Sequence, residues 1–166
     1  MKFKQLDITG FKSFSEKTTF LIEEGLTGIV GPNGCGKSNI VESLRWCMGE
    51  NSAKSMRGSG MEDVIFSGTS NRPSKNISEV ALLLDNQNKE GPSHYKDFDE
   101  ILVRRKIEKD KGSKYYINDK EVRARDVQTL FADLSTGAHS PSLISQGRIG
   151  QLVTDKPIER KSILEE

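Results

Sequence analysis

Alternating apolar and polar residues predict a series of short strands along this chain. The pattern begins with residues 2–8 and returns strongly at residues 77–85 and 100–108. Asn118-Asp119-Lys120 lies between two further alternating runs, as the turn of a hairpin does. Such runs favour an antiparallel layer. The predicted strands cover residues 2–8, 17–22, 26–30, 77–85, 100–108, 115–117 and 121–123.

Apolar residues at helical spacing replace this alternation in two places. The first predicted helix begins near Lys37 and can be ended by Gly49, and the second covers residues 124–134. Between the first helix and the next strand, residues 50–73 are rich in glycine, serine and asparagine. This composition predicts a long structured loop, with a short apolar core at residues 64–66.

One segment, between the predicted strand at 26–30 and the helix that follows, carries recognisable chemistry. It fits the phosphate-loop template G-x-x-x-x-G-K-[ST]: its residues are Gly31, Pro32, Asn33, Gly34, Cys35, Gly36, Lys37 and Ser38, followed by Asn39. In this template the glycines let backbone N–H groups surround phosphate oxygens, the lysine reaches the β and γ phosphates, and the serine hydroxyl binds Mg²⁺. The helix N-terminus adds the positive end of its dipole. The pattern therefore predicts an α/β fold of the P-loop class that binds ATP and Mg²⁺.

Composition narrows the class of protein. The 166 residues suffice for one compact domain, and 25 basic against 24 acidic residues give no whole-domain charge that favours nucleic acid or an anionic membrane. Cys35 and Cys47 are expected to be free thiols of a reducing compartment. The sequence has no metal-ligand spacing, no signal peptide and no run of roughly 20 apolar residues, so we expect a cytoplasmic protein without a membrane segment.

Three further positions each have two interpretations. Asp85 ends a predicted strand, as a second Mg²⁺-organising carboxylate does in many P-loop proteins, but a plain turn at Asp85-Asn86 is preferred. Gln146 has an amide that could coordinate Mg²⁺ or position a water, although alone it would be an ordinary loop glutamine. Residues 134–137 superficially resemble the phosphate-contacting loop of ABC proteins, but Ala138 replaces its second glycine, and we treat the match as accidental.

Several basic residues have to be weighed as contacts for phosphate. Arg57 lies in a glycine- and serine-rich loop from which a guanidinium can reach a phosphate or a neighbouring chain, although most such arginines are simply solvated. A second set of basic residues could form a stripe that binds the DNA backbone, but only if all of its members lay on one face. Adjacent residues of a strand point to opposite faces, which argues against such a stripe. That set consists of Lys4, Lys12, Lys75, Arg104, Arg105 and Lys106.

Several segments together resemble one family, the SMC (structural maintenance of chromosomes) ATPases, and specifically the N-terminal half of a bacterial SMC head. The resemblance covers almost the whole chain. Its residues lie in segments 6–14, 31–40, 42–46, 49–50, 54–58, 61–66 and 144–147. Residues 156–166 are similar to the approach to the first long coiled-coil helix of that family, and they stop in mid-pattern.

The resemblance implies an ABC-type head in which this chain is the N-terminal lobe, with an antiparallel β subdomain. Lys37 would hold the β and γ phosphates, and Ser38 with Gln146 would ligate Mg²⁺. Lys12 and Ser13 would lie beside the nucleotide. The C-terminal lobe would supply the catalytic acids and the signature loop, so no catalytic residue is expected in this chain.

The same resemblance implies the partners. Arg57 would act in ATP- and DNA-linked head engagement, in which two ATP molecules lie between two heads, and kleisin-type subunits would bind the heads. Such a protein acts in chromosome condensation and segregation. Two alternatives stay open: an autonomous P-loop NTPase or phosphotransferase that uses Asp85, and a DNA-repair ATPase similar to RecF or RecN.

Overall fold

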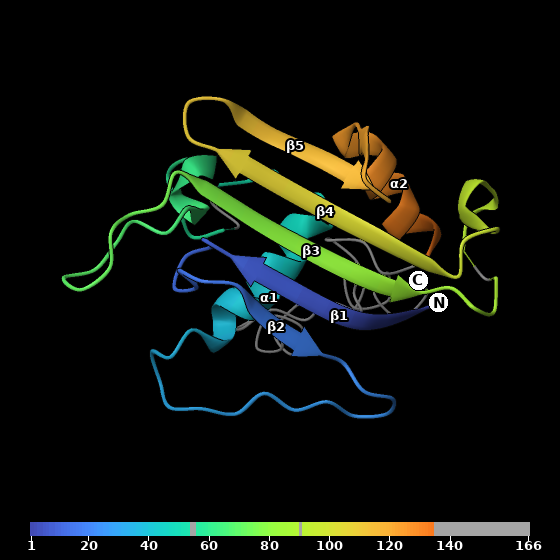
Figure 1. The fold of residues 1–166 in the computed structure, drawn as a ribbon, viewed down its shortest axis with the longest axis horizontal. Coiled ribbons are helices and arrows are strands. Elements are labelled where there is room, and N and C mark those ends of the chain that lie inside the picture. Colours follow the sequence, from blue (N-terminus) through green and yellow to red (C-terminus); the bar gives the residue numbers. More distant parts are fainter. Residues whose placement is uncertain (54–55, 90, 135–166) are drawn as a thin grey trace, which may run out of the picture.

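The computed structural model describes residues 1–53, 56–89 and 91–134, and one antiparallel sheet organises them. Figure 1 shows this sheet, whose strand order is β2-β1-β3-β4-β5-β6. The strands are β1 (Lys2–Thr9), β2 (Thr18–Leu21), β3 (Ile77–Asp85), β4 (Glu100–Glu108), β5 (Gly112–Ile117) and β6 (Lys120–Val122). The connections contain the helix α1 (Lys37–Cys47) and the 3₁₀ turns η1 (Met61–Val64) and η2 (Ser93–Tyr95), and the helix α2 (Ala124–Asp133) follows β6. The predicted antiparallel layer is confirmed.

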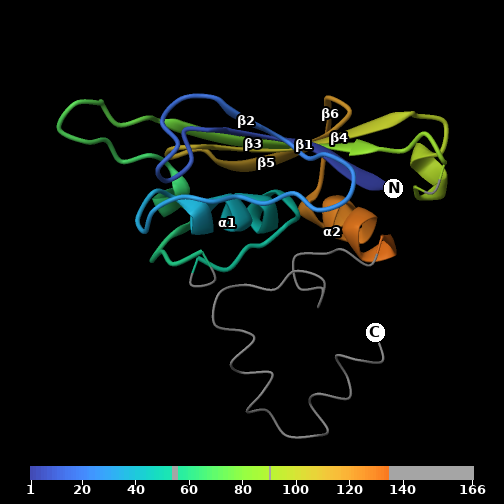
Figure 2. The ribbon, with the colours of Figure 1, turned by 90° about the horizontal axis from the view of Figure 1, so that it is seen from below.

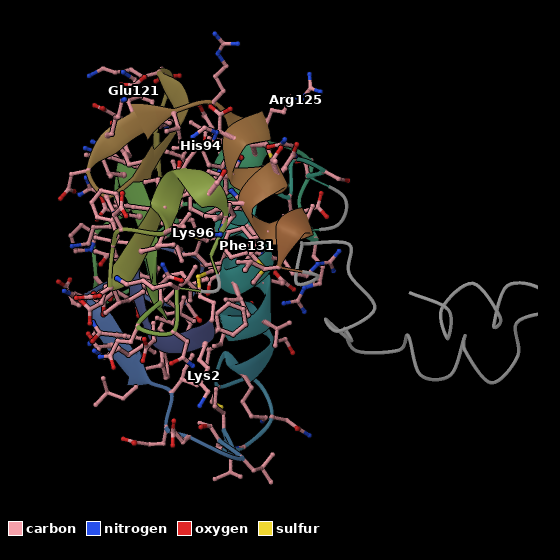
Figure 3. The ribbon with its side chains drawn as sticks, turned by 90° about the vertical axis from the view of Figure 1, so that its right-hand side faces the viewer. Lys2, His94, Lys96, Glu121, Arg125 and Phe131 are labelled. Carbon is pink, nitrogen blue, oxygen red and sulfur yellow. The ribbon has the colours of Figure 1, made fainter. Side chains whose placement is uncertain are left out.

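Both helices cover the same face of the sheet, as Figure 2 shows. The strands alternate accordingly: Val80, Leu82 and Leu84 of β3 are buried, whereas Ala81 and Leu83 between them are only partly covered. Because successive side chains of a strand point to opposite faces, one face of the sheet forms the core and the other stays partly solvated. Figure 3 shows the corresponding orientation on α2, where Phe131 points inward and Arg125 outward.

The connection after β1 lies against the loop that follows α1. Gly10 has a φ of 62°, and a Cβ there would collide with the carbonyl oxygen of Ile77, so the chain turns at glycine. The amide of Phe66 donates to the carbonyl of Gly10 at 2.8 Å, and Val64, Ile65 and Phe66 are buried. The predicted apolar core at residues 64–66 is thus confirmed, and it holds the residues after Gly10 beside α1.

The prediction of a strand at residues 26–30 is wrong, because the described structure has none there. The segment has no regular secondary structure and every residue in it is exposed, with Leu26 at 100% and Val30 at 95% of full accessibility. A strand needs a hydrogen-bonding neighbour, and an apolar run needs a surface that covers it. No described strand pairs with this segment, and the edge strand β2 pairs only with β1.

Several predictions fall on residues 135–166, which lie outside the described residues. They include Gln146, the match at 134–137 beyond Leu134, and the helix expected at 156–166. Within the part of the chain that the structure describes, no helix is long and apolar enough to cross a bilayer.

Candidate nucleotide-binding site

The phosphate-loop residues turn tightly into the start of α1. Gly34 and Gly36 have φ values of 82° and 94°, in the left-handed region, and α1 begins at Lys37 directly after them. The ammonium of Lys37 folds back and donates to the carbonyl oxygens of Gly31 (2.6 Å) and Pro32 (2.7 Å). The loop therefore closes around a cation at its centre.

The N-terminus of α1 suits an anionic ligand. Among the described residues, no side chain caps this helix end by a hydrogen bond, and its first turn contains no acidic residue. Backbone N–H groups and the positive end of the helix dipole consequently face the loop. Ser38 lies in this first turn, next to Lys37, where the template expects a hydroxyl for Mg²⁺.

Ser13, in the connection between β1 and β2, reaches the phosphate loop and the start of α1, and its neighbour Lys12 contacts Glu42 of that helix. The amide nitrogen of Asn39 donates to the hydroxyl oxygen of Ser13 at 2.9 Å. A Cβ added at Gly36 would lie 2.6 Å from the same oxygen. Gly36 is therefore required both by its backbone conformation and by the close approach of Ser13.

An acidic residue that the sequence did not single out as a site residue, Glu42, joins this group. Its side chain is only 12% exposed, and its two carboxylate oxygens form ion pairs with Lys12 and Arg57. Arg57 also donates to the side-chain oxygen of Asn39 at 2.9 Å. The spacing could have indicated Glu42, because it lies four residues after Ser38 and three after Asn39, on the same side of the helix.

The other end of α1 is held by Arg105 of β4. Its guanidinium donates to the carbonyls of Trp46 (2.8 Å) and Glu50 (2.6 Å) and lies between the rings of Trp46 and Tyr115. Burial lowers the pKa of Arg105 to about 10 and raises the pKa of Tyr115 to about 12. A residue with 2% exposure cannot contact DNA, so Arg104, Arg105 and Lys106 form no common stripe.

Asp85 lies far from the phosphate loop along the sheet. Thr9, which leads to Lys12, pairs with Glu79 at one end of β3, whereas Asp85 pairs with Lys2 at the other. At about 3.3 Å per residue, the stretch of β3 from residue 79 to residue 85 is roughly 20 Å long. The carboxylate of Asp85 instead accepts the amide of Gln87 at 2.8 Å, in the turn that the sequence predicts.

The described residues hold no ready-made metal centre. No group of three or more His, Cys, Asp and Glu side chains within them could bind a metal ion. Mg²⁺ that accompanies a nucleotide needs few protein ligands, because phosphate oxygens and waters complete its shell. A single hydroxyl at the start of α1 fits that requirement.

Comparisons with known proteins identify the relatives of this chain. The family model described as "RecF/RecN/SMC N terminal domain" matches residues 2–147. A protein of Cereibacter sphaeroides named "Chromosome partition protein Smc" is 57% identical over 166 residues, which are 100% of this chain and 14% of that protein. The chain thus spans about 14% of the length of the curated relatives it matches.

Two solved structures share the fold. One, described as "Structural biochemistry of ATP-driven dimerization and DNA stimulated activation of SMC ATPases", has a TM-score of 0.89 and 31% identity, over 99% of this chain and 98% of that chain. The other, an "SmcHead bound to the C-winged helix domain of ScpA", has a TM-score of 0.91 and 31% identity, over 99% of this chain and 50% of that chain.

Proposed function

Because the chain belongs to the RecF/RecN/SMC N-terminal domain family, we propose that it is the ATP-binding N-terminal lobe of an SMC-type ATPase head. In this role it acts in chromosome condensation and segregation. The observation that carries the proposal is the phosphate loop at the uncapped start of α1, with the ammonium of Lys37 held at its centre by two carbonyls.

The residues of the loop have separate roles in ATP binding. The glycines bring backbone N–H groups to the phosphates, and Lys37 leaves the carbonyls of Gly31 and Pro32 to bind the β and γ phosphates. Ser38 and Gln146 ligate Mg²⁺, which neutralises phosphate charge. Pro32, Asn33, Cys35 and Asn39 belong to the same binding segment.

The chain binds ATP but does not hydrolyse it alone. Hydrolysis needs a carboxylate or other group that orients water, and Asp85 lies roughly 20 Å along β3 from the residue that pairs with Thr9. We assign this chemistry to a C-terminal lobe. The exposed apolar residues Leu26 and Val30, directly before the loop, offer that lobe a surface to cover.

The further partners follow from the relatives. ATP-driven dimerization and DNA stimulation are described for one of the matching structures and binding of ScpA for another. We propose that this lobe likewise engages a second head through bound ATP, with Arg57 at the engaged surface. DNA and a kleisin-type subunit are its other partners, and the nucleoid in the cytoplasm is its location.

The test is ATP binding and steady-state ATP turnover by residues 1–166, with Lys37→Ala as the control. Mg-ATP binding that Lys37→Ala abolishes, without turnover, is the expected result, because the loop is present and we assign the catalytic acids to a second lobe. Turnover by this chain that depends on Lys37 would contradict the assignment of hydrolysis to a second lobe. Turnover that also depends on Asp85 would support the autonomous enzyme.

A further inference from the structure

One carboxylate is held by two cations beside the phosphate loop. Glu42, in the second turn of α1, is 12% exposed at its side chain, and one oxygen contacts the ammonium of Lys12 while the other contacts the guanidinium of Arg57. We propose that Glu42 is a positioning residue that fixes Lys12 and Arg57 beside the nucleotide. This inference deepens the proposed ATP-binding function and rests on it.

Each cation is held from two sides, and Glu42 is the partner that they share. Lys12 also donates to the carbonyl of Met56, and Arg57 also donates to Asn39 at 2.9 Å. Lys12 lies in the connection between β1 and β2, whereas Arg57 lies in the loop after α1. The carboxylate therefore joins three segments that are distant in sequence.

The backbone at both cations supports this role. Lys12 has a φ of 47° and Arg57 a φ of 55°, which is the left-handed region that residues other than glycine seldom adopt. Such conformations persist where surrounding contacts over-determine them, and they are concentrated at functional sites. Lys12 and Arg57 are two of the six described residues other than glycine that have a positive φ, and Glu42 anchors both of them.

The network is continuous with the phosphate loop. Arg57 donates to the side-chain oxygen of Asn39, whose amide nitrogen donates to Ser13 at 2.9 Å. The hydroxyl of Ser13 in turn lies where a Cβ at Gly36 would approach it to 2.6 Å. Displacing Arg57 therefore disturbs residues that touch the loop itself.

Replacing Glu42 by glutamine has two opposite effects on an anionic ligand. The loss of a negative charge favours phosphate, whereas the loss of the two ion pairs releases the cations from their fixed geometry. Salt weakens the first effect where solvent lies between the charges, because the Debye length is only about 6 Å at 0.3 M. The two effects have opposite signs, so weaker binding by Glu42→Gln at 0.3 M salt reports the loss of positioning.

The experiment is equilibrium binding of a fluorescent ATP analogue with Mg²⁺ to residues 1–166 at 0.3 M salt. Glu42→Gln is expected to raise the dissociation constant about tenfold, as for residues coupled in one network. Glu42→Asp, which keeps the charge, should recover part of the affinity. Glu121→Gln, at an exposed ion pair with Lys114 on β6, is the matched control and should change nothing. Unchanged or tighter binding by Glu42→Gln overturns the proposal.

A mutant cycle separates positioning from a general loss of structure. When Lys12 and Arg57 are both replaced by methionine, adding Glu42→Gln should no longer weaken binding, because the groups it positions are gone. An equal tenfold loss in that background would mean that Glu42 acts on the fold and would overturn the proposal. Failure of the ATP-binding function is distinguishable, since then Lys37→Ala would bind as well as the wild type.

Nuclear magnetic resonance of the Arg57 side chain gives a readout without nucleotide. The Arg57 side chain is 56% exposed, but its Nε–H contacts Glu42, so this proton should exchange with water more slowly in the wild type than in a solvated arginine and give a resolved signal. The signal should disappear in Glu42→Gln and persist in Glu121→Gln. A signal that Glu42→Gln leaves unchanged would show that the guanidinium is positioned by other groups.

Discussion

The two ends of α1 lie in contrasting surroundings. At its C-terminal end, Trp46 and Cys47 are fully buried, and the guanidinium of Arg105 binds the carbonyls of Trp46 and Glu50. At its N-terminal end, the loop residues from Gly31 to Cys35 are exposed. One end is part of the protein core and the other is a surface loop.

The contrast has a physical purpose in a ligand-binding helix. Backbone N–H groups that are to bind phosphate must stay accessible, and therefore cannot be satisfied by the protein itself. Such an end gains little stability from its own contacts. The buried end helps to fix its position, because a helix transmits the placement of one end to the other. The two ends should therefore respond very differently to chemical modification and to substitution.

The largest expected difference is in thiol reactivity. Cys35 lies in the exposed loop and Cys47 is the last residue of α1, with no exposed surface. A thiol reagent should modify Cys35 in the folded protein but Cys47 only when the protein unfolds. The labelling rate of Cys47 should therefore be lower than that of Cys35 by a factor of about 10³ or more. Mass spectrometry of the labelled peptides over time measures both rates.

Bound nucleotide should sharpen this result. Mg-ATP is expected to slow the labelling of Cys35 and leave that of Cys47 to the unfolding rate, because only Cys35 belongs to the phosphate loop. The Lys37→Ala variant should lose this protection. Equal labelling of both cysteines in the native protein would contradict the contrast between the two ends.

Among single substitutions that affect α1, replacing Arg105 of β4, which holds the buried end of the helix, should destabilise the fold most. Arg105→Met leaves the carbonyls of Trp46 and Glu50 buried without this donor, and we expect the free energy of unfolding to fall by about 3–4 kcal/mol. Arg104→Met is the matched control, since Arg104 lies on the opposite face and pairs with the exposed Asp119. It should cost less than about 1 kcal/mol. Urea unfolding of both variants measures the difference.

The sequence was sufficient to predict the strands, turns and helix ends that are determined by their own residues. The bounds of β3 and β4 match the predicted strands, because alternation along each strand reflects one buried face. Asn118 and Asp119 adopt φ values of 47° and 63°, as a two-residue hairpin turn requires. Gly49, with a φ of 104°, ends α1 as predicted.

The wrong or missing predictions have one cause. A local sequence pattern does not show which distant segment will contact it in the fold. Residues 26–30 have the composition of a buried strand, but no described strand pairs with them. In the sequence, Arg105 is simply the middle one of three consecutive basic residues. Only the packing of α1 against β4 explains why it is buried. The Lys12 and Arg57 contacts of Glu42 likewise depend on loops that approach α1 from distant parts of the chain.

The buried end of α1 should also make stability depend on alkaline pH. Burial raises the pKa of Cys47 from 9.0 to about 12, so above pH 9 the unfolded chain loses a proton that the folded chain keeps. The unfolded state then binds fewer protons, and stability should fall by up to about 1.4 kcal/mol per pH unit. The pKa of Tyr115, raised to about 12, adds to this fall only above pH 10, and that of Arg105, lowered to about 10, opposes it there.

Cys47 contributes most to the decline between pH 9 and pH 10, because its thiol has the lowest unfolded-state pKa of these groups. Urea unfolding at several pH values in this range should show the decline in the wild type and in Tyr115→Phe. The Cys47→Ala variant should be less stable at every pH but should lack this slope. A slope that survives in Cys47→Ala would assign the decline to another group.

The smallest effect is expected at the exposed end, and two valines in apolar runs make the comparison direct. Val80 of β3 has no exposed surface, whereas Val30, directly before the phosphate loop, is 95% exposed. Valine-to-alanine substitution should lower the free energy of unfolding by about 2 kcal/mol at Val80, through lost burial and a residual cavity, and by less than about 0.5 kcal/mol at Val30.

The same pair distinguishes an exposed segment from one that awaits a partner. In a protein that contains both proposed lobes, Val30 should become buried, and Val30→Ala should then cost about as much as Val80→Ala. Urea unfolding of this chain and of the two-lobed protein, each with both variants, makes that measurement. If Val30→Ala remains neutral in the two-lobed protein, the apolar residues before the loop do not form the surface between the lobes.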